Sequence, residues 1–338
     1  MIDLRSDTVT KPSKEMLQAM YDAEVGDDVY GEDPTINRLE KEFSDLLGKD
    51  RAVFMTSGTQ SNLSAILSHC GRGEEMIVGN SYHTAIDEAA GASVLGGIAI
   101  STIEVEEGLS LKKGSIKNAV KPDDPHYPIS KLLCLENTSQ GRAIPLEKLK
   151  KNYSEAREMK LNIHLDGARF FNAVEELKCE PKEISRYADS ISICFSKGLG
   201  APAGSILCFP EDMEHKVRRQ RKILGGALRQ VGVLGAACLY AIKNNIKRLK
   251  DDHERASFLA KALNPYHNKN NDQNLQNHTN MVFFEPIEKK GADLYSFLKN
   301  KGIIISKPCP DTRLVMHLNI TDEILNNFIK SVKEFYDD

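Results

Sequence analysis

Two apolar segments that each lead to an ionisable residue constrain this chain more than any other feature. The run 162–165 ends on Asp166, and the run 190–195 is followed by Ser196 and Lys197. Short runs of this kind are typical of strands buried inside a sheet. A lysine at the end of such a strand is costly to keep charged away from water, which favours the neutral, nucleophilic amine.

An aspartate and a nucleophilic lysine at two strand ends suit one cofactor chemistry. The lysine amine forms a Schiff base with the aldehyde of pyridoxal phosphate (PLP), and the carboxylate holds the pyridine nitrogen protonated. The sequence therefore predicts PLP as the cofactor, with Lys197 and Asp166 as catalytic residues.

Strand-like and helix-like segments alternate along the first two thirds of the chain. Apolar runs fall at 52–55, 76–78, 132–135, 162–166, 190–195 and 205–209, with helical patterns between them. This alternation predicts an α/β fold with a mostly parallel sheet between layers of helices. Ligands of such sheets bind beyond the carboxyl ends of the strands. The polar side chains that follow the predicted strands are Ser57 to Thr59, His83, Asn137, Asp166 and Lys197.

The length of 338 residues suffices for one large domain and one smaller domain. A helical pattern at 228–249 is a candidate connection between them. We expect a large PLP-binding domain over 1–248, with an N-terminal active-site segment at 1–35, and a small C-terminal α+β domain over 249–338. The Asn-rich tract 267–280 predicts a solvated loop.

Charge and cysteine usage exclude several classes of partner. The net charge of −3 gives no electrostatic case for nucleic acid, and no stretch approaches the length of a membrane span. The seven cysteines are dispersed without metal-ligand spacing, which favours reduced thiols, a cytoplasmic location and no metal site. We therefore expect a small molecule as the partner, with neither nucleic acid nor membrane.

A small-residue segment after the first predicted strand is a candidate phosphate site. Gly58 permits close approach of the backbone, and the following helix offers free N–H groups at the positive end of its dipole. Ser57 and Thr59 add hydroxyl donors. An ordinary helix N-cap is the alternative, and it is favoured if the segment is taken alone.

Two further side chains fall at predicted strand ends. His83 could stack on a pyridine ring or move protons, but a lone histidine is more often structural. Arg169 shares a loop with Asp166 and could reach the same ring, or form a surface ion pair instead.

Basic residues supply candidate anion ligands near the C-terminal half of the chain. The charged run 218–222 leads into Gly225 and Gly226. Lys222 and Arg229 are candidate phosphate ligands, and they could reach a phosphate in a neighbouring subunit across an interface. Arg313 opens a predicted strand, where its guanidinium could grip a carboxylate bidentately. A solvated face or a rim salt bridge is the plain alternative for each.

Taken together, these motifs resemble the low-specificity L-threonine aldolases, which are fold-type I PLP enzymes of the β-eliminating lyase group. The resemblance runs nearly end to end. It is carried by the segments 4–10, 26–34, 57–59, 136–138, 166–169 and 196–199, by His83, by the Arg-rich stretch to Arg229, and by Arg313.

The resemblance implies an activity and a set of roles. The activity is a carbon–carbon (aldehyde) lyase that cleaves L-threonine, L-allo-threonine and other L-3-hydroxy-amino acids to glycine and an aldehyde, within threonine catabolism. The implied assembly is a homotetramer with active sites shared across a dimer interface. The implied cofactor ligands are Tyr30, Gly58, Thr59, His83, Asp166, Arg169, Lys197, Lys222 and Arg229, and the implied ligands of the substrate carboxylate are Ser6, Arg169 and Arg313.

One position departs from the family pattern. After Glu136 to Thr138 the family commonly has His-Asn, and this chain has Ser139 and Gln140. The base for the substrate hydroxyl and the threo or allo preference therefore stay open. Another PLP reaction such as β-elimination or transamination, and a non-catalytic binding protein on the same fold, are the alternative functions. A Rossmann dehydrogenase ranks low, because no G-x-G-x-x-G follows the first strand.

Overall fold

The computed structural model describes residues 2–106, 109–268, 274–287 and 290–337. The chain divides into two compact units. One, called the sheet unit here, combines Ser13–Phe195 with Pro202–Tyr240, and the other, called the terminal unit, combines Met1–Pro12, Ser196–Ala201 and Ala241–Asp338. The predicted domain boundary at residue 248 stays a prediction.

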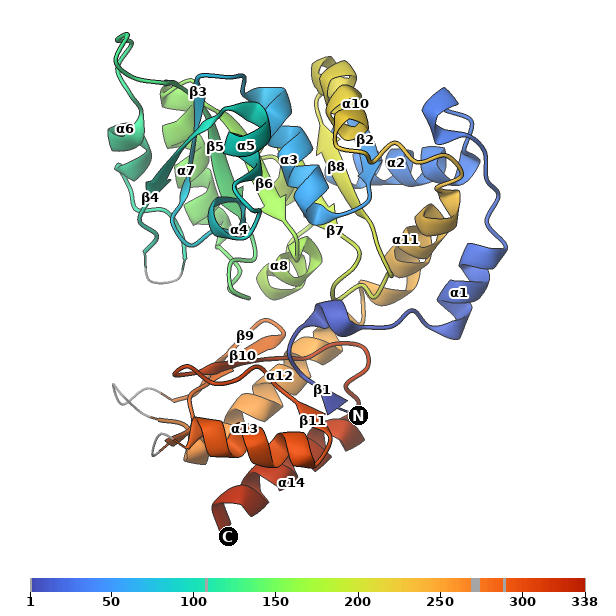
Figure 1. The fold of residues 1–338 in the computed structure, drawn as a ribbon, viewed down its shortest axis with the longest axis vertical. Coiled ribbons are helices and arrows are strands. Elements are labelled where there is room, and N and C mark those ends of the chain that lie inside the picture. Colours follow the sequence, from blue (N-terminus) through green and yellow to red (C-terminus); the bar gives the residue numbers. More distant parts are fainter. Residues whose placement is uncertain (1, 107–108, 269–273, 288–289, 338) are drawn as a thin grey trace. The chain divides into compact units, whose positions relative to one another are not determined.

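A seven-stranded sheet forms the centre of the sheet unit (Figure 1). Its strands are β2 (Arg51–Met55), β3 (Glu74–Gly79), β4 (Ala99–Ile103), β5 (Ile129–Glu136), β6 (Asn162–Gly167), β7 (Ser190–Cys194) and β8 (Ser205–Phe209). In space their order is β2-β8-β7-β6-β5-β3-β4. The five strands from β7 to β4 in that order are parallel, and β8 is antiparallel to both of its neighbours. The mostly parallel sheet predicted from the sequence is confirmed.

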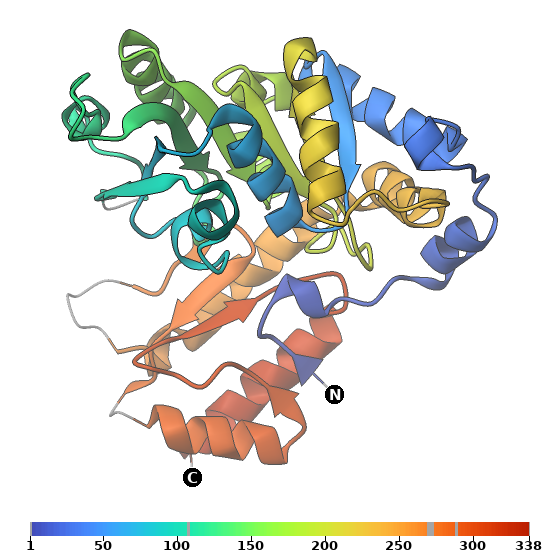
Figure 2. The same ribbon diagram turned by 45° about the horizontal axis from the view of Figure 1, so that its top comes forward.

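Helices cover both faces of this sheet. The helices of the sheet unit are α1 (Lys14–Tyr21), α2 (Pro34–Leu47), α3 (Gly58–His69), α4 (His83–Ile86), α5 (Gly91–Gly96), α6 (Ser115–Ala119), α7 (Leu146–Glu158), α8 (Phe170–Leu177), α9 (Pro181–Ser185) and α10 (Glu214–Ile223), with the 3₁₀ turns η2 (Asp28–Tyr30) and η3 (Glu211–Met213). Figure 2 shows α3 and α10 packed side by side in front of the sheet. On the opposite face α9 contacts α2, α7 and α8.

Local sequence signals set the ends of α2. The Asp33 side chain accepts a hydrogen bond from the backbone N–H of Ile36, and Pro34 occupies the first turn. Gly48 closes the helix in the left-handed conformation. The apolar face of α2 is buried, and Phe43 makes edge-to-face contact with Phe195 at 5.1 Å between ring centroids. These contacts pack α2 against the sheet.

The terminal unit has its own core and two small sheets. Its elements are β1 (Ile2–Asp3), η1 (Asp7–Val9), α12 (Leu249–Leu263), η4 (Asn264–Tyr266), β9 (Asn277–His278), β10 (Met281–Phe284), α13 (Gly291–Asn300), β11 (Ile303–Ile304), β12 (Thr312–Val315) and α14 (Asp322–Asp337). β1 pairs parallel with β11, and β12-β10-β9 form an antiparallel sheet. Buried side chains of α12, β10, α13 and α14 share one hydrophobic cluster.

Three expectations need correction. The continuous helix predicted at 228–249 is wrong: α11 (Gly232–Asn245) ends before α12 begins at Leu249. The edge strand β4 was not predicted, because its residues are at most partly buried and carry no strong apolar signal. The tract 267–280 is not wholly a solvated loop, since Thr279 and Asn280 are buried; residues 269–273 lie outside the described residues.

Among the described residues, none of the helices combines the length and apolar character needed to cross a membrane.

Candidate active site

Three adjacent parallel strands deliver polar groups to one edge of the sheet. Asp166 lies at the end of β6, Glu136 ends β5, and their Cα atoms are register partners. His83 follows β3 and begins α4. The parallel pairing of β3, β5 and β6 thus brings His83, Glu136 and Asp166 together, as expected for a ligand site beyond the carboxyl ends of strands.

Asp166 is buried, with 2% of its surface exposed, and its carboxylate is held from two sides. Oδ1 accepts a hydrogen bond from the backbone N–H of Ala168 at 3.0 Å. Oδ2 accepts one from the side-chain amide of Asn62 at 2.9 Å. A carboxylate fixed in this way has a defined direction for a further donor, as the pyridinium N–H of PLP requires.

His83 lies against the same carboxylate. Its ring Nδ1 is 3.1 Å from Glu88 Oε1 and 3.8 Å from Asp166 Oδ2. Its backbone N–H donates to Glu136 Oε2 at 2.6 Å. His83 is therefore held by two carboxylates, that of Glu88 through its ring and that of Glu136 through its backbone. The carboxylate of Asp166 lies close by.

Burial changes the acidity of two of these carboxyl groups. Desolvation, reinforced by the charge of Asp166, raises the pKa of Glu136 to about 7. Desolvation also raises the pKa of Glu88, opposed by the hydrogen bond from His83. Such shifts are characteristic of groups that hold or exchange protons at functional sites.

The same residues could bridge a cation. One ligand atom each from His83, Glu88 and Asp166 lie within 4.8 Å of one another. The Asn62 amide, however, donates to both carboxylates, at 2.8 Å to Glu88 and 2.9 Å to Asp166, and so occupies lone pairs that a metal would need. The sequence-based expectation of no metal ligands stays a prediction.

The candidate phosphate site lies at the start of α3. Ser57 is the N-cap, and its hydroxyl accepts from the Gln60 N–H. None of the described hydrogen bonds uses the backbone N–H of Gly58 or Thr59. A Cβ on Gly58 would lie 2.6 Å from the Cys194 sulfur, so this position accepts only glycine without a shift.

The spacing along α3 suits the length of PLP. Gly58 and Asn62 are four residues apart in one helix, which is about 6 Å along its axis. One end of that turn offers free backbone N–H groups, and the other end holds Asp166. A phosphate at the first and a pyridine nitrogen at the second fit these residues.

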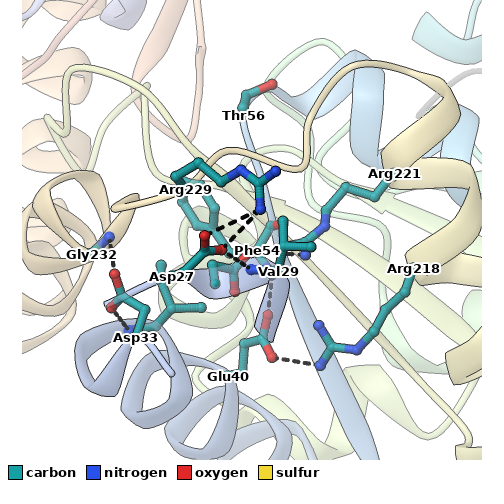
Figure 3. Close-up of polar contacts among 12 residues, drawn as sticks. Asp27, Val29, Asp33, Glu40, Phe54, Thr56, Arg218, Arg221, Arg229 and Gly232 are labelled. Atoms are coloured by element: carbon teal, nitrogen blue, oxygen red, sulfur yellow. Dashed lines mark hydrogen bonds and ion pairs between the residues drawn. The ribbon is translucent and has the colours of Figure 1, made fainter. Parts of the chain in front are cut away.

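Arg229 is paired with a carboxylate (Figure 3). Its guanidinium lies 3.1 Å from Asp27 Oδ2, and more than half of its side chain is exposed. The chain before it packs on α3, since Gln60 donates to the Leu224 carbonyl and a Cβ on Gly226 would collide with the Gln60 side chain. The loop leading to Arg229 therefore adjoins the candidate phosphate site.

Two of the arginines of α10 form ion pairs with carboxylates. Arg218 pairs with Glu40 at 2.9 Å, and buried Arg221 pairs with Asp28 at 2.8 Å (Figure 3 shows both arginines and Glu40). Lys222 is exposed and lines a cavity of about 480 Å³ together with Tyr30. Two of the sequence-predicted residues thus lie on one surface, and their role stays a prediction.

Arg169, like Asp166 and His83, belongs to the sheet unit. It is half-buried and immediately precedes α8, three residues after Asp166. Its predicted contact with the substrate carboxylate or the cofactor stays a prediction.

The remaining predicted residues belong to the terminal unit. Lys197 follows the end of β7 by three residues, and its carbonyl accepts from the Gly200 N–H at 2.8 Å. The Ser6 hydroxyl caps η1. Arg313 lies in β12, and its guanidinium donates to the Arg5 carbonyl at 3.5 Å. The roles of Lys197, Ser6 and Arg313 stay predictions.

Sequence reasoning missed Asn62 and Glu88. Asn62 had only a weak signal, since it lies one helical turn after Gly58 but its neighbours Gln60, Ser61 and Ser64 are polar as well. Glu88 had none, because nothing local distinguishes it from the neighbouring Asp87.

Comparisons with known proteins show the family and the fold of this chain. Residues 3–286 match the family model described as beta-eliminating lyase. The low-specificity L-threonine aldolase of Escherichia coli K12 is 46% identical over 96% of this chain and 96% of its own length. A Leishmania major threonine aldolase structure superposes with a TM-score of 0.85 at 20% identity, covering 99% of both chains, and a structure described as SPT with a PLP internal aldimine superposes at 0.73 and 17% identity, covering 98% and 86%.

The two structural likenesses establish the fold, which is that of fold-type I PLP enzymes. The full-length sequence identity and the family model establish more. The chain belongs to the beta-eliminating lyase family, and within that family to the group of the low-specificity L-threonine aldolases.

Proposed function

We propose that this lyase cleaves L-threonine, L-allo-threonine and related L-3-hydroxy-amino acids to glycine and an aldehyde. The observation that carries the proposal is the buried Asp166 carboxylate, fixed by two N–H donors one helical turn from a free helix N-terminus. That arrangement suits a cofactor with a cationic ring nitrogen and a phosphate. The substrate follows from the relatives that match along their full length, which are low-specificity L-threonine aldolases.

We propose PLP as the cofactor. When bound, it supplies an electron sink for the electron pair released as the Cα–Cβ bond breaks. Lys197 would hold it through its amine, Asp166 would keep the proton on the ring nitrogen, and Gly58 with Thr59 would bind the phosphate through backbone N–H groups. Arg229, Lys222 and Tyr30 complete the proposed set of cofactor ligands, with Arg169.

The substrate is held by its carboxylate. Ser6, Arg169 and Arg313 would bind this group and so set which bond at Cα stands perpendicular to the cofactor ring. A guanidinium binds a carboxylate through two parallel hydrogen bonds, which fixes orientation as well as position. Clamping in this way selects Cα–Cβ cleavage over loss of the Cα proton.

His83 is the candidate for handling the substrate hydroxyl proton. Its Nδ1 lies 3.1 Å from Glu88 Oε1 and 3.8 Å from Asp166 Oδ2, so the imidazole lies beside the carboxylate proposed to hold the cofactor. Ser139 replaces the histidine that the family commonly has, and it lies buried near the end of β5. We therefore assign to His83 both stacking on the cofactor ring and proton transfer.

We further propose a homotetramer whose active sites are shared across a dimer interface. Val29 and Tyr30 line the cavity that Lys222 also lines, and they leave 41% and 75% of their surfaces exposed. Exposed apolar and cationic side chains on one surface suit contact with a second copy of this chain. Sedimentation velocity on the PLP-loaded protein tests this, and a concentration-independent monomer contradicts it. The seven free thiols support a cytoplasmic location.

The direct experiment measures the products from both substrate epimers. Purified protein with added PLP is incubated with L-threonine and with L-allo-threonine, and the aldehyde and glycine are quantified. Equal amounts of aldehyde and glycine support retro-aldol cleavage. Pyruvate or 2-oxobutyrate with ammonia, from serine or threonine, would instead identify elimination chemistry.

A further inference from the structure

A continuous chain of buried hydrogen bonds leads away from Asp166 through the interior of the sheet unit. Asn62 Nδ2 lies 2.9 Å from Asp166 Oδ2, and Asn62 Oδ1 lies 3.1 Å from His164 Nε2. His164 Nδ1 lies 2.8 Å from the Ser190 hydroxyl, which lies 2.8 Å from His69 Nε2. Asn62, His164 and Ser190 are each no more than 1% exposed.

Rigid elements hold every member of this chain. His164 and Ser190 are register partners on β6 and β7, and His164 is on the same face of β6 as Asp166, two residues along. Asn62 and His69 lie seven residues apart on α3, about two turns, so they share one face of that helix. The series of hydrogen bonds therefore runs from α3 to the sheet and back to α3.

The chemistry of the groups fixes the direction of donation. The Asn62 amide faces two carboxylate oxygens, those of Glu88 and Asp166, and carboxylates accept. Its nitrogen must therefore lie on that side, which leaves its oxygen to accept from His164. A neutral His164 that donates from Nε2 must accept at Nδ1 from Ser190, and Ser190 in turn accepts from Nε2 of His69.

Both histidines have the protonation state that this direction needs. Burial lowers the pKa of His164 to about 3 and that of His69 to about 4. Each is neutral near pH 7 and carries one N–H. The direction His69 to Ser190 to His164 to Asn62 to Asp166 is then the single consistent assignment.

We propose that Asn62 is a positioning residue for Asp166, and that His164, Ser190 and His69 lock its amide in place. One N–H goes to each carboxylate, so Asn62 holds Asp166 apart from Glu88 and keeps its free lone pair directed at the ring nitrogen of PLP. Without this amide, Asp166 can turn toward His83 Nδ1, which is 3.8 Å away. The inference rests on the proposed function only in taking PLP as the ligand of Asp166.

The first test needs neither cofactor nor activity. Nitrogen-15 NMR of histidine-labelled, cofactor-free protein reports which ring nitrogen of each histidine carries the proton, with His69→Gln used for assignment. We expect both His69 and His164 to be neutral, with the proton on Nε2, from about pH 6 to about pH 8. A proton on Nδ1 of His164 would contradict the proposed direction of these hydrogen bonds.

The second test is a double-mutant cycle on cofactor affinity. Ser190→Ala should weaken PLP binding about tenfold, because it breaks the chain two bonds away from Asp166. In an Asp166→Asn background it should cause no further loss, since the group being positioned has changed. Equal losses in both backgrounds would mean that Ser190 acts only on general stability.

A matched control lies on the same strand. Ser192→Ala removes an equally buried hydroxyl that contacts Ser205 instead, and it should leave PLP affinity within about twofold of the parent. Asn62→Leu removes the amide itself, and it should lower kcat with little change in KM for threonine. If Asn62→Leu does not fold, the Ser190 cycle still decides.

The outcomes separate this inference from the proposed function. If the protein binds PLP and shows the Ser190–Asp166 coupling but releases no aldehyde, the positioning role is supported and the aldolase activity is contradicted. If it releases aldehyde but the two losses are additive, the activity is supported and the positioning role is contradicted.

Discussion

The backbone N–H of His83 donates to Glu136 Oε2 at 2.6 Å, which ties the start of α4 to the end of β5. β5 is the neighbour of β6, and Glu136 is the register partner of Asp166. The imidazole is thereby anchored beside Asp166 through a different strand. The position of His83 is set by the sheet rather than by its own short helix.

Replacing Glu136 by glutamine should change how stability depends on pH. Because the pKa of Glu136 is raised to about 7 in the folded chain, the unfolded chain loses this proton at lower pH. The raised pKa contributes stability below about pH 4, and that contribution is lost as the pH rises through about 7. The free energy of unfolding of the parent should therefore fall by on the order of 1–3 kcal/mol across this window, and that of Glu136→Gln should not.

Urea unfolding of the cofactor-free protein between about pH 5 and about pH 8 measures this difference. Glu147→Gln, at an exposed position in α7, is the control and should follow the parent. Parallel curves for the parent and Glu136→Gln would contradict the raised pKa.

Gly58→Ala should damage both folding and phosphate binding. Its Cβ would lie 2.6 Å from the Cys194 sulfur, and relieving that overlap should cost about 1–3 kcal/mol of the free energy of unfolding. Adding Cys194→Ala removes the sulfur and should restore part of the stability. Gly71→Ala is the control, because its nearest neighbour would be an ordinary 3.6 Å away. A fully stable Gly58→Ala protein would show that this packing is looser than described.

Asp166→Asn should lower kcat by roughly 10²-fold, because an amide cannot stabilise a protonated ring nitrogen as a carboxylate does. Asparagine has a single oxygen, so it can accept from Ala168 or from Asn62 but not from both at the positions of Oδ1 and Oδ2, and urea unfolding measures the resulting change in stability. Steady-state kinetics with L-threonine check this, with Asp212→Asn at an exposed position as the control. An unchanged kcat would remove the proposed role of Asp166.

Lys197→Ala should abolish turnover and the visible absorption of bound PLP, because no other group is proposed to bond to the cofactor aldehyde. Absorption spectra and aldehyde release are the two measurements. Lys216→Ala, an exposed position on α10, should retain both. Full activity in Lys197→Ala would place the Schiff base elsewhere.

His83→Phe separates two roles of the histidine. Phenylalanine preserves an aromatic face for stacking but cannot move a proton, so a loss of about 10²- to 10⁴-fold in kcat with little change in PLP affinity identifies proton transfer. A near-parent kcat in His83→Phe would exclude proton transfer, and it would leave stacking, which phenylalanine preserves, as the one proposed role of His83.

Local patterns in the sequence located most of the sheet and several of its functional strand ends. β7 is buried along its whole length, and β5 and β6 are buried over their last five residues. In β5 the buried run is apolar up to Glu136, whereas β6 and β7 alternate isoleucine or leucine with polar residues. The N-cap at Ser57 and the glycine after it are likewise local signals. Edge strand β4 and the antiparallel direction of β8 left no such mark, since direction depends on the connection between strands.

The sequence by itself therefore determined the α/β architecture, the family, and Asp166 at a strand end as a candidate site residue. Tertiary structure alone decided the partners of Asp166. Asn62 reaches it across 104 positions of sequence, and the same amide reaches Glu88 across 26. Periodicity records whether a side chain is buried, whereas a hydrogen bond depends on which buried groups the packing of α3 on the sheet brings within about 3 Å.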